Sequence, residues 1–311
     1  MTIRFDGQVA IVTGAGNGLG RSHAFELAAR GAKVVVNDLG ASLGGEGGSL
    51  SAADKVVRDI IAKGGEAIAN GANVTDKAQV DAMVAMAIQK WGRVDILVNN
   101  AGILRDKSFS NMDIENFSTV IDVHLMGAAI CTKAVWGIMR EQQYGRIIMT
   151  SSSSGLYGNF GQANYGAAKM GVVGLMNTLH LEGAKYNIHV NSLAPAAATR
   201  MTEDLFSAEV TDLTTVKSVT AALAYLAHKD APSKVILCAG AGVYAATRIY
   251  ETQGIYLPPK QQTPENIAEN IDKILDADAQ TMLAQGSEQV VRFIHKATQA
   301  QGIELENGGV Q

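Results

Sequence analysis

The sequence predicts an α/β fold, in which a doubly wound parallel sheet of about seven strands carries helices on both faces. Two observations predict it. Short runs rich in β-branched residues alternate with longer helical patterns, and a glycine-rich turn joins the first run to the first helix. The length of 311 residues fits one such domain over residues 1–250 and a C-terminal helical extension over residues 251–311.

The elements follow each other in a regular βα order. The expected strands are Val9–Val12, Lys33–Asn37, Glu66–Asn70, Ile96–Val98, Arg146–Thr150, His189–Leu193 and Lys234–Cys238. The expected helices are Gly20–Arg30, Ala52–Lys63, Val80–Trp91, Asn116–Met139, Ala163–Tyr186 and Val216–Ala227, with Pro264–Leu275 and Ser287–Ala300 in the extension. Gly40–Ser51 is a loop rich in Gly and Ser that interrupts this order.

The composition excludes several classes of protein. With 47% apolar and 18% charged residues, the chain should form a globular core. A net charge of −4 without a Lys/Arg cluster gives no support for a nucleic-acid or membrane partner. The only cysteines, Cys131 and Cys238, lack a zinc spacing, so we expect no metal site and no disulfide framework.

The chain shows no signal peptide, no run of 18 apolar residues and no peroxisomal address at its end, so the expected compartment is the cytoplasm.

A glycine-rich turn follows the first expected strand. It reads GAGNGLG, with the spacing Gly14-x3-Gly18-x-Gly20, and leads into the first helix. Glycine lets backbone N–H groups approach a pyrophosphate at the positive end of that helix. The turn, with Asn17 and Leu19, therefore predicts a dinucleotide site on a Rossmann-type fold.

Asp38 ends the second expected strand, where the adenosine ribose should lie. Its carboxylate can accept hydrogen bonds from both ribose hydroxyls. It would repel the 2′-phosphate of NADP by about 4 kcal/mol at ~4 Å and an effective dielectric constant of ~20. The residue therefore favours NAD. The alternative is an ordinary turn-forming Asp before Gly40.

Tyr165 and Lys169 stand one helical turn apart, and Ser152 follows the fifth expected strand. A free tyrosine has a pKa near 10, and lowering it to about 7 takes roughly 4 kcal/mol, much of which Lys169 and a positive nicotinamide could supply. Tyr165 would then exchange a proton with the oxygen of a carbonyl or an alcohol. The Ser152 hydroxyl could bind that oxygen.

In order and spacing, the glycine turn, Asn99-Asn100-Ala101-Gly102, Ser152, Tyr165 and Lys169 resemble the short-chain dehydrogenase/reductase family over residues 5–245. The resemblance implies that Tyr165 is the acid/base, that Lys169 binds the nicotinamide ribose and lowers the pKa of Tyr165, and that Ser152 orients the substrate. The further cofactor-binding residues that it implies are Asn73, Val74, Asn100, Ala101, Gly102, Pro195 and Thr199.

His124 departs from that family, which often has an Asn at this place to hold a water of the proton relay. A histidine can also hold a water and could itself titrate. The alternative is a packed histidine with a backbone partner.

A closer resemblance extends through less common segments. These are Asn37–Gly40 with the glycine-rich insertion after it, Ala101–Asp106, Asp122–Leu125, Tyr157–Tyr165, and the residues from Ala194 to Thr202. They look like the (3R)-hydroxyacyl-CoA dehydrogenase unit of type 2 peroxisomal multifunctional enzymes, which also carries a helical extension. The resemblance implies oxidation of a (3R)-hydroxyacyl-CoA with NAD, in a homodimer or homotetramer.

Two features leave alternatives open. Arg105, Lys107 and Arg200 are candidates to bind the CoA phosphates, or else solvated surface charges. The Gly40–Ser51 loop could shape the adenosine pocket or contact a partner, or else be a flexible connection.

Other functions remain open as well. A steroid or other secondary-alcohol dehydrogenase would use the same three residues, and an NADPH-dependent 3-oxoacyl reductase is disfavoured by Asp38. A non-catalytic NAD-binding sensor or scaffold is the alternative from another class.

We expect Tyr165→Phe to keep NADH binding and to lose at least ~100-fold in turnover, because the general acid/base is removed. A fluorescence titration with NADH and a steady-state assay measure the two. Near-normal turnover would contradict the role assigned to Tyr165.

Overall fold

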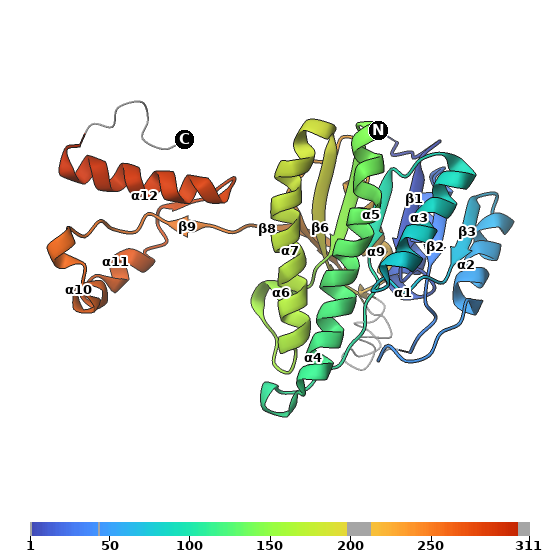
Figure 1. Ribbon diagram of the computed structural model, residues 1–311, viewed down its shortest axis with the longest axis horizontal. Coiled ribbons are helices and arrows are strands. Elements are labelled where there is room, and N and C mark those ends of the chain that lie inside the picture. Colours follow the sequence, from blue (N-terminus) through green and yellow to red (C-terminus); the bar gives the residue numbers. More distant parts are fainter. Residues whose placement is uncertain (1, 43, 198–212, 304–311) are drawn as a thin grey trace. The chain divides into compact units, whose positions relative to one another are not determined.

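The computed structural model describes residues 2–42, 44–197 and 213–303. The chain divides into two compact units, Met1–Thr247 and Arg248–Gln311 (Figure 1). The division lies close to the boundary expected after residue 250.

The first unit is built on a sheet with the strand order β3-β2-β1-β4-β5-β6-β7-β8. Its strands are β1 (Val9–Thr13), β2 (Lys33–Asn37), β3 (Glu66–Asn70), β4 (Ile96–Asn99), β5 (Gly145–Thr150), β6 (Ile188–Ala196), β7 (Ile236–Gly240) and β8 (Val243–Thr247). Strands β1 to β7 pair in parallel and match the expected strands. The predicted Rossmann-type fold is confirmed.

The sheet has one strand more than expected. Strand β8 pairs antiparallel with β7 at the edge, with Gly240 opposite Val243. Nearly all of its residues are exposed. The segment therefore lacks the buried, β-branched pattern by which the parallel strands were recognised.

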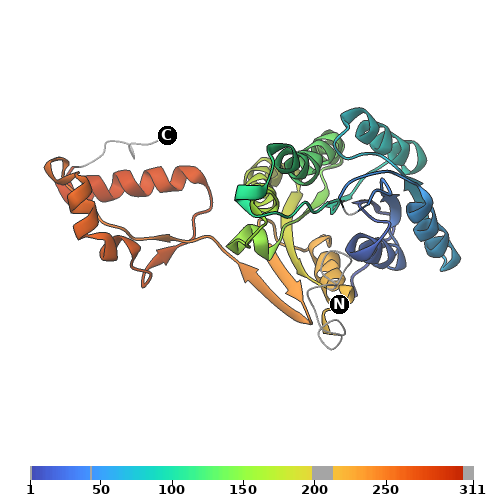
Figure 2. The same ribbon diagram turned by 90° about the horizontal axis from the view of Figure 1, so that it is seen from below.

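Helices cover both faces of the sheet (Figures 1 and 2). They are α1 (Gly18–Ala29), α2 (Ser51–Ala62), α3 (Lys77–Trp91), α4 (Ile114–Ile121), α5 (Gly127–Gln142), α6 (Ser153–Tyr157), α7 (Ala163–Gly183) and α9 (Val216–Leu226). Side chains of α1, α2 and α9 share one apolar core with the sheet, and those of α3, α5 and α7 share the other. Because β1 to β7 are parallel, their carboxyl ends all lie at one edge of the sheet.

The expected long helix over Asn116–Met139 is interrupted. A π-helical turn, η2 (Asp122–Met126), separates α4 from α5. By length and apolar composition alone, the stretch Ile114–Gln142 would suffice to cross a membrane. Its Cys131 and Met139 side chains lie in the core of the first unit instead, where burial raises the pKa of the Cys131 thiol to about 12.

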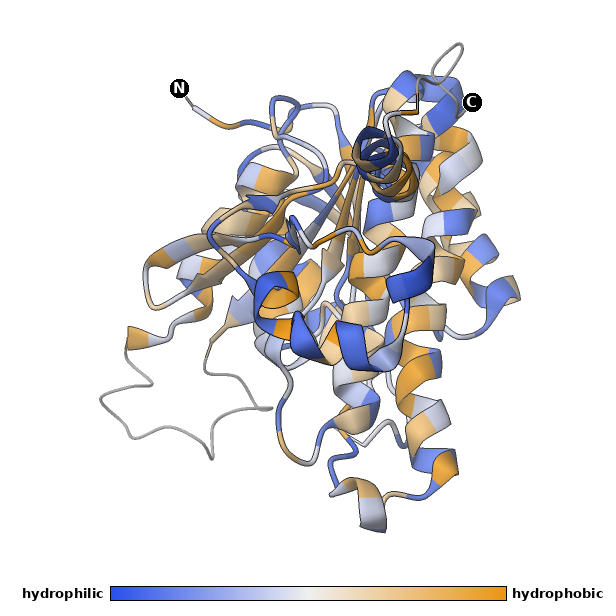
Figure 3. Ribbon diagram, turned by 90° about the vertical axis from the view of Figure 1, so that its left-hand side faces the viewer, coloured by the Kyte–Doolittle hydropathy of each residue, from blue (hydrophilic) through white to orange (hydrophobic). Residues whose placement is uncertain are grey.

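The second unit consists of α10 (Pro264–Glu269), α11 (Ile271–Leu275), α12 (Gly286–Gln301) and a ribbon of β9 (Glu251–Thr252) and β10 (Gln280–Thr281). Thr263 caps α10 through a hydrogen bond from the Asn266 N–H. None of the described residues of this unit is buried. Hydrophilic and hydrophobic residues occur side by side along the same helices (Figure 3).

Candidate active site

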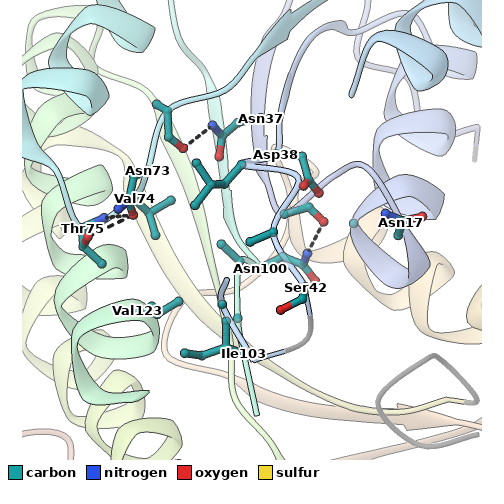
Figure 4. A pocket seen from close by; sticks show the side chains of 18 of the residues that line it. Asn17, Asn37, Asp38, Ser42, Asn73, Val74, Thr75, Asn100, Ile103 and Val123 are labelled. Atoms are coloured by element: carbon teal, nitrogen blue, oxygen red, sulfur yellow. Dashed lines mark hydrogen bonds between the residues drawn. The ribbon is translucent and has the colours of Figure 1, made fainter. Parts of the chain in front are cut away.

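A cavity of about 380 Å³ opens at the carboxyl edge of the sheet. It lies beside β1 and β4, where the strand order reverses and α/β folds bind ligands. Eleven of the residues predicted to bind the cofactor line it: Gly14, Asn17, Gly18, Leu19, Gly20, Asp38, Asn73, Val74, Asn100, Ala101 and Gly102. Figure 4 shows several of them around the cavity.

The glycine turn approaches the neighbouring backbone closely. Gly14 has a φ of +64°, and a Cβ there would lie 2.8 Å from the Ala101 Cα atom. A Cβ on Gly20 would overlap the carbonyl oxygen of Gly14. Helix α1 starts at Gly18 with no acid in its first turn, and its N-cap, Asn17, makes no side-chain capping bond. Its first N–H groups and its positive end are therefore available to a phosphate.

Thr13, which the sequence analysis missed, joins β1 to β4. Its Oγ1 accepts hydrogen bonds from the N–H groups of Asn100 and Ala101, each 3.0 Å long. The Asn100 side chain donates to the carbonyl oxygens of Thr13 and Gly14, at 2.9 and 3.1 Å. The two strand ends are thus held together beside the glycine turn.

Asp38 forms the turn that was one of its two expected roles, and its binding of the ribose stays a prediction. Its Oδ1 accepts a hydrogen bond from the Gly40 N–H at 2.7 Å, which shapes a turn. Its Oδ2 accepts one from the Gly16 N–H, also at 2.7 Å, and so faces the glycine turn. Each carboxylate oxygen has a second lone pair that a ribose hydroxyl can use.

Eight lining residues were not predicted: Asn37, Leu39, Ala72, Thr75, Ile103, Thr119, Asp122 and Val123. Ala41, Ser42 and Gly45 also line the cavity, and they belong to the Gly40–Ser51 loop, for which shaping the adenosine pocket was one of the expectations. Of the eight, Leu39, Ala72, Thr75 and Ile103 follow β2, β3 or β4 in the chain. Their position after a parallel strand was therefore the signal that could have found them. Asn73 was predicted, but its Oδ1 accepts hydrogen bonds from the N–H and hydroxyl of Thr75 and so shapes the local turn.

Ser152 and Tyr165 come together at the end of β5. Ser152 is the N-cap of α6, where its Oγ accepts a hydrogen bond from the Ser154 N–H at 3.2 Å. Tyr165 lies in the first turn of α7. Burial raises the pKa of Tyr165 above its ordinary value, while a hydrogen bond from Ser152 acts in the lowering direction.

Lys169 lies one turn further along α7 and is 3% exposed. Its Nζ donates a hydrogen bond of 2.6 Å to the Thr150 carbonyl oxygen and lies 5.4 Å from the centre of the Tyr165 ring. Burial lowers the pKa of Lys169 to about 7.

The lowering of the Tyr165 pKa toward 7, which was expected from Lys169 together with a positive nicotinamide, stays a prediction, and the protein's own groups do not bring it about. Burial opposes the charged forms of Tyr165 and of Lys169 alike, so the lysine charge that should lower the tyrosine pKa is itself disfavoured.

His124 lies in the π-helical turn and is buried. Its Nε2 is 3.1 Å from the backbone nitrogen of Ile103 and 2.8 Å from its carbonyl oxygen, and its ring meets that of Tyr165 edge-on at 5.1 Å. The pKa of His124 lies well below its ordinary value, mainly because the ring is buried. The charge of Lys169 is a second, smaller cause in the same direction. The ring therefore stays neutral and has the backbone partner that one interpretation expected.

A second cavity of about 10 Å³, at the lower limit for holding one water molecule, lies between His124, Lys169, Asn99 and Thr150. Three buried polar atoms along it, His124 Nδ1, Asn99 Oδ1 and Thr150 Oγ1, have no hydrogen-bond partner among the described residues.

The other predicted residues are less informative. Pro195 lies half-buried in β6, whereas Thr199 and Arg200 are outside the described residues. The Arg105 guanidinium donates to the Gly44 carbonyl oxygen and to Asn116 Oδ1, so it is not a free charge at the surface. Lys107 is exposed, with its Nζ 3.8 Å from Asp113.

Comparison with known proteins decides the family. Residues 8–210 match the family model described as short chain dehydrogenase. The chain belongs to the short-chain dehydrogenase family. It is thus an oxidoreductase, in which Ser152, Tyr165 and Lys169 lie together at the carboxyl edge of the sheet.

Three similar proteins illustrate the family. Peroxisomal multifunctional enzyme A of Dictyostelium discoideum is 46% identical over 93% of this chain and 65% of its own length. The full-length peroxisomal multifunctional enzyme type 2 of Drosophila melanogaster has a solved structure with a TM-score of 0.79 and 35% identity over 94% of this chain and 49% of that one. A 7α-hydroxysteroid dehydrogenase complexed with NADH and 7-oxo glycochenodeoxycholic acid gives a TM-score of 0.70 and 28% identity over 77% of this chain and 95% of that one. This chain therefore spans only part of the multifunctional relatives.

We expect Lys169→Met to stabilise the fold at pH 7 and to lose that advantage toward pH 10. Because the folded pKa of Lys169 is about 7 and the unfolded one about 10.4, the unfolded chain binds more protons in this window. The wild-type protein therefore gains up to about 1.4 kcal/mol of stability per pH unit from this residue, and the methionine variant does not.

Urea unfolding of both proteins at pH 7, 8, 9 and 10 measures this difference, with Lys133→Met, an exposed lysine on α5, as the control. A difference in unfolding free energy that does not change with pH would contradict it.

Proposed function

We propose that the protein oxidises (3R)-hydroxyacyl-CoA thioesters to 3-oxoacyl-CoA with NAD⁺. The observation that carries the reaction type is the convergence of Ser152, Tyr165 and Lys169 at the carboxyl edge of the sheet. The substrate class rests on the resemblance of the less common sequence segments to hydroxyacyl-CoA dehydrogenase units.

The residues around the larger cavity fit an adenine dinucleotide. The glycine turn and the open start of α1 suit its diphosphate, and Asp38 suits the adenosine ribose. The solved relative that contains NADH supports the same cofactor class. Because the Asp38 carboxylate would repel a 2′-phosphate, we propose NAD rather than NADP.

The side chains divide the reaction between them. When bound, the oxidised dinucleotide supplies a hydride acceptor and a positive charge that favours the tyrosine phenolate. The Ser152 hydroxyl would donate a hydrogen bond to the substrate oxygen, and Tyr165 would accept the proton of the substrate hydroxyl while the carbon that bears this hydroxyl gives up its hydrogen as a hydride. Lys169 holds the end of β5 through the Thr150 carbonyl oxygen and places its Nζ beside the Tyr165 ring.

A free sterol is the second candidate substrate, because the NADH-containing relative carries a bile-acid steroid. The same serine, tyrosine and lysine would oxidise a ring hydroxyl. The homodimer or homotetramer and the cytoplasmic compartment stay predictions; the word peroxisomal in the names of the relatives applies to those proteins.

We expect NADH to form from NAD⁺ and a (3R)-hydroxyacyl-CoA, and the (3S) epimer to react at least ~100-fold more slowly. Only one configuration at C3 can place the hydroxyl at Tyr165 and, at the same time, direct the hydrogen of that carbon toward the cofactor. Absorbance at the NADH band measures both rates. The same assay is carried out with a free sterol. Faster turnover of the sterol than of its CoA thioester would contradict the proposed acyl-CoA substrate and favour the sterol.

Asp38→Asn should raise the ratio of kcat/KM with NADP⁺ to kcat/KM with NAD⁺ by at least ~10-fold, since it removes the charge that repels the 2′-phosphate. Asp59→Asn, on the neighbouring α2, removes an equal charge next to Arg21 and should leave the ratio unchanged. An unaltered ratio in Asp38→Asn would remove the argument for NAD.

A further inference from the structure

The described residues of the insertion Gly40–Ser51, which are all but residue 43, make hydrogen bonds of their own. Its base is closed by the Ser49 N–H, which donates to the Leu39 carbonyl oxygen at 2.9 Å. Within it, the Ser42 N–H donates to the Glu46 carbonyl oxygen at 2.8 Å. Gly40 has a φ of +72°, and a Cβ there would overlap the Ser49 backbone, so glycine is required at the turn.

This loop forms part of the wall of the larger cavity. Ala41, Ser42 and Gly45 line it, together with Asp38 at the start of the loop. Figure 4 shows Ser42 and Ile103 among the side chains around the cavity. The conformation of the loop therefore decides the shape of the adenosine side of the cofactor site.

Arg105 ties the tip of the loop to the body of the first unit. Its Nε donates a hydrogen bond of 3.0 Å to the Gly44 carbonyl oxygen, and an Nη donates one of 2.8 Å to Asn116 Oδ1 at the start of α4. A rigid, planar guanidinium can make both bonds at once, whereas an ammonium is a single point of attachment. Ile103, on the same segment, lies beside Gly45.

The segment that carries Arg105 is itself fixed from the catalytic side. The Arg105 carbonyl oxygen accepts a hydrogen bond of 3.0 Å from the buried Asn164 side chain, and Asn164 Oδ1 accepts one of 2.7 Å from the Tyr165 N–H. The Ile103 backbone meets His124. The backbone of Arg105 is thus fixed by Asn164, while its guanidinium binds the loop.

We propose that Arg105 is a positioning residue for the cofactor, holding the Gly40–Ser51 loop in the conformation that lines the adenosine side of the cavity. The inference rests on the proposed function only in that a dinucleotide occupies this cavity. Because Arg105 acts through the loop, the affinity for the cofactor depends on it, while the hydride and proton transfer at Tyr165 does not.

The test compares Arg105→Ala, Arg105→Lys and Asn116→Ala with Lys133→Ala. Lys133 is an exposed cation on α5. NADH fluorescence titration gives the Kd, steady-state kinetics give the KM for NAD⁺ and kcat, and hydrogen exchange reports on the amides of residues 40–51.

Arg105→Ala should raise the Kd for NADH and the KM for NAD⁺ by about tenfold, as expected for the loss of hydrogen bonds to a charged donor, with kcat within about twofold. Arg105→Lys and Asn116→Ala should have smaller effects in the same direction, and Lys133→Ala none. Exchange of the loop amides should accelerate in Arg105→Ala and not in Lys133→Ala.

An unchanged Kd in Arg105→Ala, or a fall in kcat at unchanged Kd, would overturn the inference. Failure of the wild-type protein to bind NADH would instead overturn the proposed cofactor. NADH binding without turnover of a hydroxyacyl-CoA would overturn only the proposed substrate, since the Kd comparison still tests Arg105.

Discussion

Thr13 and Asn100 hold the ends of β1 and β4 together at the place where the strand order reverses. There, helices leave the sheet toward opposite faces, and the carboxyl ends of the strands expose polar backbone groups. Gly14 can approach Ala101 closely because both strand ends are fixed. The cavity and the start of α1 take their positions from this junction. Asp38 reaches the glycine turn from the adjacent strand, β2.

Much of this arrangement could be read from the sequence. Val-rich strands such as β2 are buried on both faces, so their pattern is clear, and the glycine turn has a fixed place after β1. Strand β8 was missed because it is an exposed edge strand. The loop after Asp38 has no periodicity, and its position depends on Arg105, which is distant in sequence. The sequence showed which charges are present near Tyr165, but not how deeply each is buried.

Burial dominates the electrostatics of the catalytic side chains. Tyr165, Lys169 and His124 lie in one desolvated region, and for each of them burial is the largest influence on the pKa, in the direction of the neutral form. The protein alone thus brings little charge to the reacting atoms. In such an environment an added charge is weakly screened, so a bound cation would change the proton affinity of Tyr165 strongly.

The glycine turn also limits how this gene can vary. Every single-base change of a glycine codon that alters the residue, other than to a stop codon, introduces a side chain. At position 14 that side chain would begin 2.8 Å from the Ala101 Cα atom, and at position 20 it would overlap the Gly14 carbonyl oxygen. Neither neighbour is a flexible side chain that could move aside. For these two codons, only synonymous changes leave the backbone of the cofactor site undisturbed.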